Sequence, residues 1–389
     1  MKDLTLISNK TPLRICTVTP CQDRPILVEN LLKTLDTVRS EDSLKEWIDF
    51  IIVDSTPENS EAAAHIRACC EAVGAVYLQG PQSVRAKRNM GALRAREMGA
   101  DVVLFIDSDC QAQPGLFREH QVAYQTAQAP FTGRPVGAVI GITRFVGDES
   151  MAYRAAAQTP FLDSFCFAEN MPEVPWAPCT NFSVLLEVFE QIGGFSENWN
   201  YRLGGDDTEL GRRLNNAGYA ILSRPQAVVF HDKSTWNRWS AIIERAWRWG
   251  RMDINVRSNE PVENRQWIAP QPLPIAVLIV PVALLWGVVP FLTVVASIFV
   301  LTPLITGFLR TQKSTVPIDY IGAEFLLLVF QLGSLYESFK VGRPWLSYVE
   351  VVSHPMQIGT SWDTRRRSAW VTVLMFFVWI VLLFISFRT

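Results

Sequence analysis

Short apolar runs alternate with helical segments over the first hundred residues. The apolar runs at 14–19, 48–53, 75–78 and 102–106 have the length of buried strands. The helices between them have recognisable terminal residues: Asp23 and Pro25 open the first, Thr56 and Pro57 open the second, Gly74 ends it, and Ser83 and Gly99 bound the third. Strands alternating with helices predict an α/β domain, with a mostly parallel sheet and helices on both faces.

The charged residues are distributed unevenly along the chain. From Gln266 to Leu309 there is no charged residue at all. Residues 1–265 hold 28 Lys and Arg and 33 Asp and Glu, whereas residues 266–389 hold only 8 and 5. We therefore expect two domains, a polar domain over 1–265 and a membrane domain over 266–389.

Three apolar segments of the second domain are long enough to cross a bilayer, which takes about 20 residues of helix. The uncharged run predicts a helical hairpin with spans at about 273–289 and 291–309, turning near Gly287 and Pro290. A single kinked helix is the alternative for this run. Residues 370–387 form the third predicted span.

A less apolar segment at about 318–340 contains Asp319, Glu324 and Glu337. Because charges inside a bilayer are costly, we expect this segment to be an amphipathic helix lying in the membrane interface. The basic clusters at 310–313 and 365–367 are expected on the cytoplasmic face. The topology with three spans follows, and a topology with four spans stays open.

The N-terminal sequence, the net charge and the cysteines indicate the cellular location and exclude some kinds of partner and metal site. No apolar core follows the N-terminal charges, so no signal peptide is predicted. The polar domain is then expected in the cytoplasm, at the inner or plasma membrane, held by a multi-pass membrane domain. A net charge of −2 gives no reason to expect nucleic acid as a partner. The seven cysteines include no C-x-x-C pair, so the sequence supports neither a zinc site nor a disulfide framework.

Carboxylates follow two of the predicted strands. Asp54 comes directly after the second strand, and Asp107 and Asp109 come directly after the fourth. The carboxyl ends of parallel strands form the ligand-binding edge of an α/β sheet. Two carboxylates in a D-x-D spacing there are able to converge on Mg²⁺ or Mn²⁺, which prefer oxygen ligands and often bridge to diphosphates.

With these motifs the chain resembles the family 2 glycosyltransferases over residues 12–250. The segment SVRAKRNMGALRA is similar to the A-R-N-x-G helix of the family, with Arg88 matching its arginine. The resemblance implies a Rossmann-like GT-A fold followed by C-terminal transmembrane helices. It implies that Asp54 contacts the nucleotide base, that Asp107 and Asp109 bind metal and nucleotide, and that Asn181 lies on the acceptor side.

Two later motifs extend the resemblance. The run GGDDTEL is similar to the family's G-E-D-x-E-L, which places Asp207 at the catalytic base and Asp206 at the preceding acidic position. The run RAWRW fits the R-x-x-R-W pattern of membrane-bound synthases. There Trp249 would line the acceptor site, and Arg245 and Arg248 would approach the diphosphate.

Some positions depart from the family pattern. The loop after the first strand lacks the usual aromatic and asparagine, Asp54 is followed by Ser55, and Cys179 stands where glycine is common. His231 follows a strand-like run, and the resemblance offers it as a further metal ligand. These departures affect the nucleotide contacts and the acceptor class, and they leave the metal pair and the base intact.

Together these patterns predict an inverting, metal-dependent glycosyltransferase with Mn²⁺ or Mg²⁺ as cofactor. The donor would be a nucleotide-diphosphate sugar, and the acceptor a lipid-linked sugar or growing glycan beside membrane lipid. A processive polysaccharide synthase is the alternative within the same family. A nucleotidyltransferase would need a glycine-rich loop after the first strand, which is absent from TVTPCQDRP. A catalytically silent membrane scaffold is the alternative from another class.

Overall fold

The computed structural model describes residues 12–197, 203–260, 265–267, 280–310, 316–351, 373–374, 376–382 and 384–385. The chain forms two compact units. The first takes in 1–147, 163–202 and 206–232, and the second takes in 148–162, 203–205 and 233–389. This division differs from the predicted boundary at 265, because the helix α10 (Trp239–Asn259) packs along α14 (Pro317–Lys340) within the second unit.

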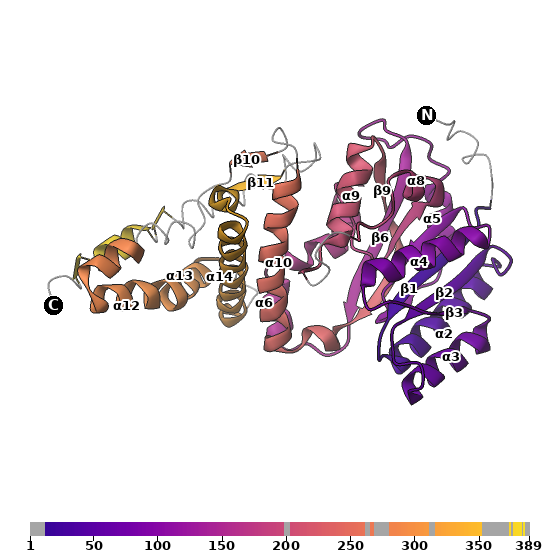
Figure 1. Cartoon of the computed structure of the whole chain (residues 1–389), viewed down its shortest axis with the longest axis horizontal. Helices are drawn as coiled ribbons and strands as arrows, with labels where there is room; N and C mark the ends of the chain where they lie inside the picture. The colour runs from indigo at the N-terminus through magenta and orange to yellow at the C-terminus, as the bar shows by residue number, and fades with distance from the viewer. Residues whose placement is uncertain are drawn as a thin grey trace. The chain divides into compact units, whose positions relative to one another are not determined.

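The first unit is built on a mixed nine-stranded sheet (Figure 1). Its strands are, in spatial order, β3 (Val76–Gln79), β2 (Ile48–Asp54), β1 (Ile15–Cys21), β4 (Val102–Phe105), β8 (Phe182–Leu185), β6 (Val136–Val146), β9 (Ala220–Asp232) and β5 (Cys110–Ala112), with β7 (Glu173–Val174) on β9. The four strands predicted from the sequence lie side by side and are parallel. The α/β class is therefore confirmed, while β8 runs antiparallel to both β4 and β6.

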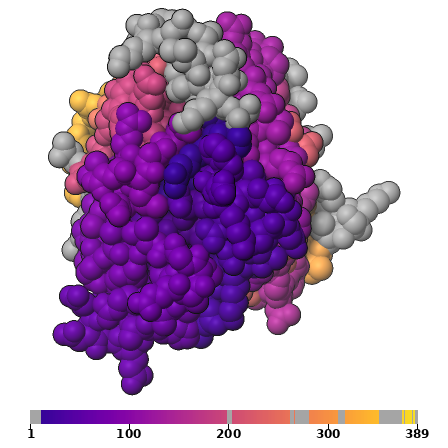
Figure 2. All heavy atoms as spheres, turned by 90° about the vertical axis from the view of Figure 1, so that its right-hand side faces the viewer, coloured from indigo at the N-terminus to yellow at the C-terminus, as the bar shows by residue number. Residues whose placement is uncertain are grey.

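The predicted helices cover the two faces of this parallel part. The helices α2 (Pro25–Glu41) and α3 (Glu61–Val73) lie on one side of the sheet, and α4 (Val84–Glu97) lies on the other (Figure 1). This arrangement follows from right-handed crossovers in both directions from β1. Residues of this N-terminal part form most of the face seen in Figure 2. The shorter helices of the unit are α5 (Leu116–Ala123), α7 (Phe167–Asn170), α8 (Leu186–Gln191) and α9 (Asp206–Asn216).

The helix ends follow local chemistry with one correction. Ser83 caps α4 by accepting a hydrogen bond from the backbone of Ala86, and Gly74 ends α3 in the left-handed conformation, as predicted. The expected cap of α3 at Thr56 is wrong. Ser60 caps α3 instead, because the Thr56 hydroxyl is used by the carboxylate of Asp54.

The second unit is helical. It contains α6 (Met151–Ala157), α10, α12 (Val288–Ala296), a π-helical turn (Ser297–Leu301), α13 (Thr302–Arg310) and α14, with a strand pair of β10 (Arg265–Trp267) and β11 (Val349–Val351). The 3-10 segment Pro160–Cys166 spans the change from the second unit to the first. The α10 and α14 backbones approach closely because Gly250 faces the backbone of Phe330.

Two helices of the second unit are long and apolar enough to cross a membrane. They are Val288–Phe308 and Pro317–Lys340. The predicted break in the uncharged run lies at Gly287, which has a φ of 128° and separates helical residues 280–286 from α12. Pro290 falls within the first turn of α12, where proline is tolerated. Residues 273–279 lie outside the described residues, and the described residues within 373–385 are helical.

The segment predicted to lie in the membrane interface is the helix α14. Its charged residues have partners within the second unit: Asp319 pairs with Arg154 on α6, and Glu337 pairs with Arg251 on α10, at 2.9 and 2.8 Å. Both carboxylate side chains are less than a tenth exposed. The charges on which the interfacial prediction rested are therefore accommodated by protein contacts.

Candidate active site

The carboxyl ends of β1 to β4 meet at one edge of the first unit's sheet. Cys21 at the end of β1 lies opposite Asp54 at the end of β2, which lies opposite Gln79 at the end of β3. Asp107 and Asp109 follow the end of β4. The structure thus brings three of the predicted site aspartates to the edge where α/β sheets bind ligands.

Asp54 is fully buried at this edge. One carboxylate oxygen accepts hydrogen bonds from the Thr56 backbone and hydroxyl at 2.9 and 2.6 Å, and the other accepts one from the Tyr77 hydroxyl at 3.1 Å. Burial, together with the Asp54 carboxylate, raises the pKa of Tyr77, so its hydroxyl stays protonated as a donor. Three donors therefore fix the carboxylate of Asp54.

Asp109 is held between a cation and an imidazole. Its Oδ2 atom lies 3.0 Å from Arg24 Nη1, and its Oδ1 atom lies 3.3 Å from His231 Nε2. The side chains of Asp109 and His231 are only 7% and 6% exposed. Cys110 is the third member of this buried cluster, whose ligand atoms lie within 4.8 Å of one another. Burial raises the pKa of Cys110 well above its ordinary range, so it remains a thiol.

The imidazole of His231 has a defined orientation toward Asp109. Its Nδ1 atom lies 2.9 Å from the backbone carbonyl of Asp232, and since a carbonyl only accepts hydrogen bonds, Nδ1 is the donor. In the neutral ring this leaves the lone pair of Nε2 facing the Asp109 carboxylate. Two acceptors facing each other in a buried site require a proton or a cation between them.

This donor set fits a divalent cation. Carboxylates suit Mn²⁺ and Mg²⁺, and a neutral imidazole is a common metal ligand in proteins. The 3.3 Å between Asp109 Oδ1 and His231 Nε2 is close to the roughly 3 Å between adjacent ligands of an octahedral ion. Asp107 adds a second carboxylate nearby. Burial raises its pKa, and the negative charge of Asp109 adds to this effect, while the cation Arg88 opposes it. A bound cation would relieve the same repulsion.

Arg88 joins the D-x-D segment to the start of α9. Its Nη2 atom donates to Asp107 at 3.0 Å, and its Nη1 atom donates to Asp206. The arginine is only 6% exposed, and its guanidinium lies 5.5 Å from the ring centre of Phe195. The Arg88 side chain therefore contacts both the D-x-D segment and the start of α9, which lie about a hundred residues apart in the sequence.

Asp207 lies beside Asp206 in the first turn of α9. Its Oδ1 atom accepts a hydrogen bond from the backbone of Thr208 at 2.8 Å. Burial, followed by the charge of Asp206, raises the pKa of Asp207 to about 7 against an opposing effect of Arg88. A carboxylate with a pKa near neutral is suited to accept a proton in a reaction near pH 7.

Asn181 has a structural place in the core. Its amide nitrogen donates to the carbonyls of Ile142 and Ala227, its amide oxygen bonds to His120, and the residue is 1% exposed. Both amide hydrogens are thus used internally. This arrangement contradicts the expectation that Asn181 contacts an acceptor.

The remaining predicted residues belong to the second unit, on α10. Arg245 donates to the Thr235 carbonyl and lies over the ring of Trp236. Trp249 packs against the rings of Trp236 and Phe161, with ring centres 5.9 and 5.3 Å away. Within the described part of the chain, the buried Nε atom of Arg248 has no hydrogen-bond partner, which leaves a donor for a ligand.

Three further residues of the first unit support the site, and of these Asn89 belongs to the A-R-N-x-G motif of the sequence. Arg24 neutralises Asp109 from the loop after β1. Lys87, which is 2% exposed, donates to the carbonyl of Cys21. Asn89 accepts a hydrogen bond from the backbone of Phe195 and donates one to its carbonyl, which ties α4 to the turn Gly193–Phe195. Both Lys87 and Asn89 lie at helical positions that would otherwise face the core. A charged or amide side chain at such a position is the sequence feature that indicates a functional role.

No known family model matches the chain. It is similar to the O-antigen biosynthesis protein RfbC of Myxococcus xanthus, with 28% identity over 165 residues, or 39% of this chain and 12% of that protein. It is also similar to the probable glycosyltransferase YdaM of Bacillus subtilis, with 21% identity over 240 residues, or 58% of this chain and 52% of that protein. The chain thus matches about half or less of the length of these relatives.

Solved structures show more distant similarity. The mannosyltransferase PcManGT from Pyrobaculum calidifontis, in complex with GDP-Man and Mn²⁺, has a TM-score of 0.47 and 15% identity, and the match covers 97% of this chain and 87% of that chain. GalNAc-T7, with UDP, GalNAc and Mn²⁺, has a TM-score of 0.43 and 12% identity, covering 65% of this chain and 52% of that chain.

Proposed function

We propose that this protein is a metal-dependent, inverting glycosyltransferase that uses a nucleotide-diphosphate sugar. The observation that carries the proposal is the bridge from Arg88 to both Asp107 and Asp206. It holds the candidate metal ligands and the candidate base in one site at the carboxyl edge of the sheet. The similarity to RfbC and to the probable glycosyltransferase YdaM supports the same reaction class.

The donor would bind along the edge formed by β1 to β4. Asp109 and His231, with Asp107 beside them, would hold Mn²⁺ or Mg²⁺. The bound ion supplies a positive charge that offsets the charge on the departing nucleotide diphosphate. Asp54, held by its three donors, would contact the base of the nucleotide. These assignments rest on the carboxylates and the imidazole oriented toward one another in the first unit.

Asp207 would act as the general base. As the acceptor hydroxyl oxygen attacks the anomeric carbon, its proton passes to the Asp207 carboxylate, and the bond from that carbon to the diphosphate oxygen breaks. Direct attack from the opposite side inverts the configuration at the carbon. The pKa of about 7 supports this role, since a substantial fraction of Asp207 is ionised near neutral pH. Asp206 would keep Arg88 in position.

The second unit supports an acceptor at a membrane surface. Exposed apolar side chains such as Leu285 and Phe308 lie on or before the Val288–Phe308 helix. We infer a multi-pass protein of the cell membrane with its catalytic unit in the cytoplasm. Trp249 offers an aromatic surface for a sugar, and Arg248 offers a donor for an anionic group. A lipid-linked sugar or a growing glycan would be the acceptor.

The proposal is tested with the full chain purified in detergent. Release of nucleotide diphosphate is measured with UDP-, GDP- and TDP-sugars, with Mn²⁺ or Mg²⁺, in the presence of membrane lipid extract. We expect one donor class to be turned over and the product to carry inverted configuration. The Asp109→Ala and Asp207→Asn variants should both be strongly impaired. Turnover of no donor, or full activity in both variants, would reject the assignment.

A further inference from the structure

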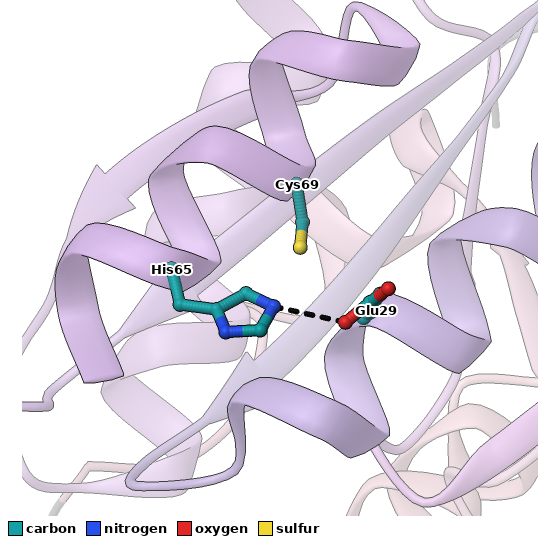
Figure 3. A group of neighbouring side chains, drawn as sticks. All are labelled: Glu29, His65 and Cys69. Carbon is teal, nitrogen blue, oxygen red and sulfur yellow. Dashed lines mark hydrogen bonds and ion pairs between the residues drawn. The ribbon is translucent and has the colours of Figure 1, made fainter. Parts of the chain in front are cut away.

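A second cluster of possible metal ligands lies on the helices α2 and α3, away from the D-x-D segment in the sequence. Glu29 is on α2, and His65 and Cys69 are on α3. One ligand atom from each of the three lies within 4.8 Å of the other two. Figure 3 shows the histidine and cysteine projecting from one helix toward the glutamate on its neighbour.

The sequence spacing explains the geometry of this cluster. His65 and Cys69 are four residues apart, so they lie on the same face of α3, one turn from each other. The helices α2 and α3 pack against each other, which brings Glu29 to that face. His65 Nε2 lies 2.9 Å from Glu29 Oε2. All three residues are partly exposed, so an ion from solution has access to them.

From this cluster we propose a zinc site formed by Glu29, His65 and Cys69 that joins α2 to α3. Carboxylate, imidazole and thiolate are the three ligand types that proteins use for Zn²⁺. Mn²⁺ and Mg²⁺ prefer oxygen ligands, so the thiolate makes this site bind them less well than Zn²⁺. Three protein ligands leave the fourth tetrahedral position to a water molecule.

The neighbouring charges are compatible with binding. Hydrogen bonds from Lys33 and His65 lower the pKa of Glu29, so its carboxylate is ionised and able to bind a cation. Burial, followed by the Glu29 charge, raises the pKa of Cys69, so the thiol must release a proton to solvent as it binds zinc. Lys33 pairs with Glu29 Oε1 at 2.5 Å, and its side chain is 67% exposed. Because an exposed ion pair is weak, Lys33 competes only weakly with a metal ion for the Glu29 carboxylate.

The site would stabilise the segments that carry the candidate active site. The helix α2 begins directly after Arg24, which pairs with Asp109, and α3 follows the Asp54–Thr56 turn. A zinc ion shared by the two helices would restrain the chain that leaves both loops. The inference does not depend on the proposed reaction, because the three ligands belong to neither the metal pair nor the base.

The full chain in detergent, stripped of metal, is titrated with Co²⁺ as a spectroscopic substitute for Zn²⁺. We expect a thiolate-to-cobalt charge-transfer band in the wild type that is lost in Cys69→Ser. Cys166→Ser is the matched control, since Cys69 and Cys166 are the two partly exposed cysteines and the other five are buried. It should keep the band. Competition with Zn²⁺ should show at least about tenfold weaker binding in His65→Ala and Glu29→Gln.

The outcomes separate this site from the buried Asp109, Cys110 and His231 cluster. Zn²⁺ should raise the unfolding temperature of the wild type and of Cys166→Ser by more than it raises that of Cys69→Ser, in which, among the described residues, only the Asp109, Cys110 and His231 cluster could bind the ion. Lys33→Ala should bind Zn²⁺ more tightly, because it removes a competitor of the metal. A charge-transfer band that persists in Cys69→Ser would assign the thiolate to another cysteine and overturn the proposal, as would zinc affinity unchanged in His65→Ala.

Discussion

Replacing Asp207 with asparagine tests whether the environment of this carboxylate is arranged for proton transfer at the expense of stability. The folded protein raises the pKa of Asp207 from 3.8 to about 7, mainly through burial and then through Asp206. The native state therefore binds a proton more tightly than the unfolded chain does. As the pH rises from about 4 to about 7, the free energy of unfolding falls, and the full loss is present above pH 7.

The structure sets the size of this effect. Raising the pKa of Asp207 from 3.8 to about 7 corresponds to at most about 4 kcal/mol of unfolding free energy. Asp207 is partly exposed, and its charge is partly compensated by Arg88, so we expect about 2 kcal/mol. Asparagine keeps an oxygen that accepts the Thr208 backbone hydrogen bond. Asp207→Asn should therefore stabilise the protein by about 2 kcal/mol at about pH 8 and by little at about pH 4.

The same variant should lose activity by a factor of about 10² to 10⁴, the usual contribution of a general base. In the wild type, activity should rise with pH through about 7 as Asp207 loses its proton. Two measurements are made on the full chain in detergent: denaturant unfolding at both pH values, and nucleotide diphosphate release against pH. Equal stability of the two proteins at about pH 8, or a wild-type rate independent of pH between about 6 and 8, would refute the reasoning.

Three further predictions concern packing and charge. Asp109→Asn should lower the turnover rate by about 10²-fold and raise the Mn²⁺ concentration needed for half-maximal rate, measured by metal titration; an unchanged requirement would remove Asp109 from the metal site. Gly91→Ala should cost about 1–3 kcal/mol of unfolding free energy, because the added Cβ would lie 2.3 Å from Val18 Cγ1; an unaltered unfolding midpoint would contradict this contact. Arg251→Met should destabilise the second unit by about 3 kcal/mol by leaving the buried Glu337 with only the half-exposed Lys340 at 3.7 Å, and adding Glu337→Met should recover most of the loss in thermal unfolding.

The order of strands and helices in the parallel half of the sheet could be predicted from local pattern. The apolar runs and caps such as Ser83 and Gly74 act over a few residues, so the sequence contains the whole signal. The cap at Ser60 could not be foreseen. Thr56 and Ser60 are both suitable capping residues, and the choice was made by the hydrogen bond from the Thr56 hydroxyl to Asp54, two residues earlier at the end of β2.

The boundary between the units shows a second kind of limit. The loss of charge after residue 265 marks a change in solvent preference along the chain. It does not mark where compact units divide, because α10 packs along α14 and pairs Arg251 with Glu337. Charges in α14 that suggested exposure to the membrane surface are instead satisfied by protein partners far away in the sequence.

The sequence by itself determined which residue types follow which strand: Asp54, and then Asp107 and Asp109, at the ligand-binding edge. Tertiary structure decided what those residues are able to do. Arg88 connects Asp107 to Asp206, burial and Asp206 raise the pKa of Asp207, and the core consumes both amide hydrogens of Asn181. Proton affinity and ligand geometry depend on burial and on distances of a few ångströms between side chains. The link from Arg88 to Asp206 joins residues 118 positions apart, and those of Asn181 cross 39 and 46 positions, so only the folded chain sets these distances.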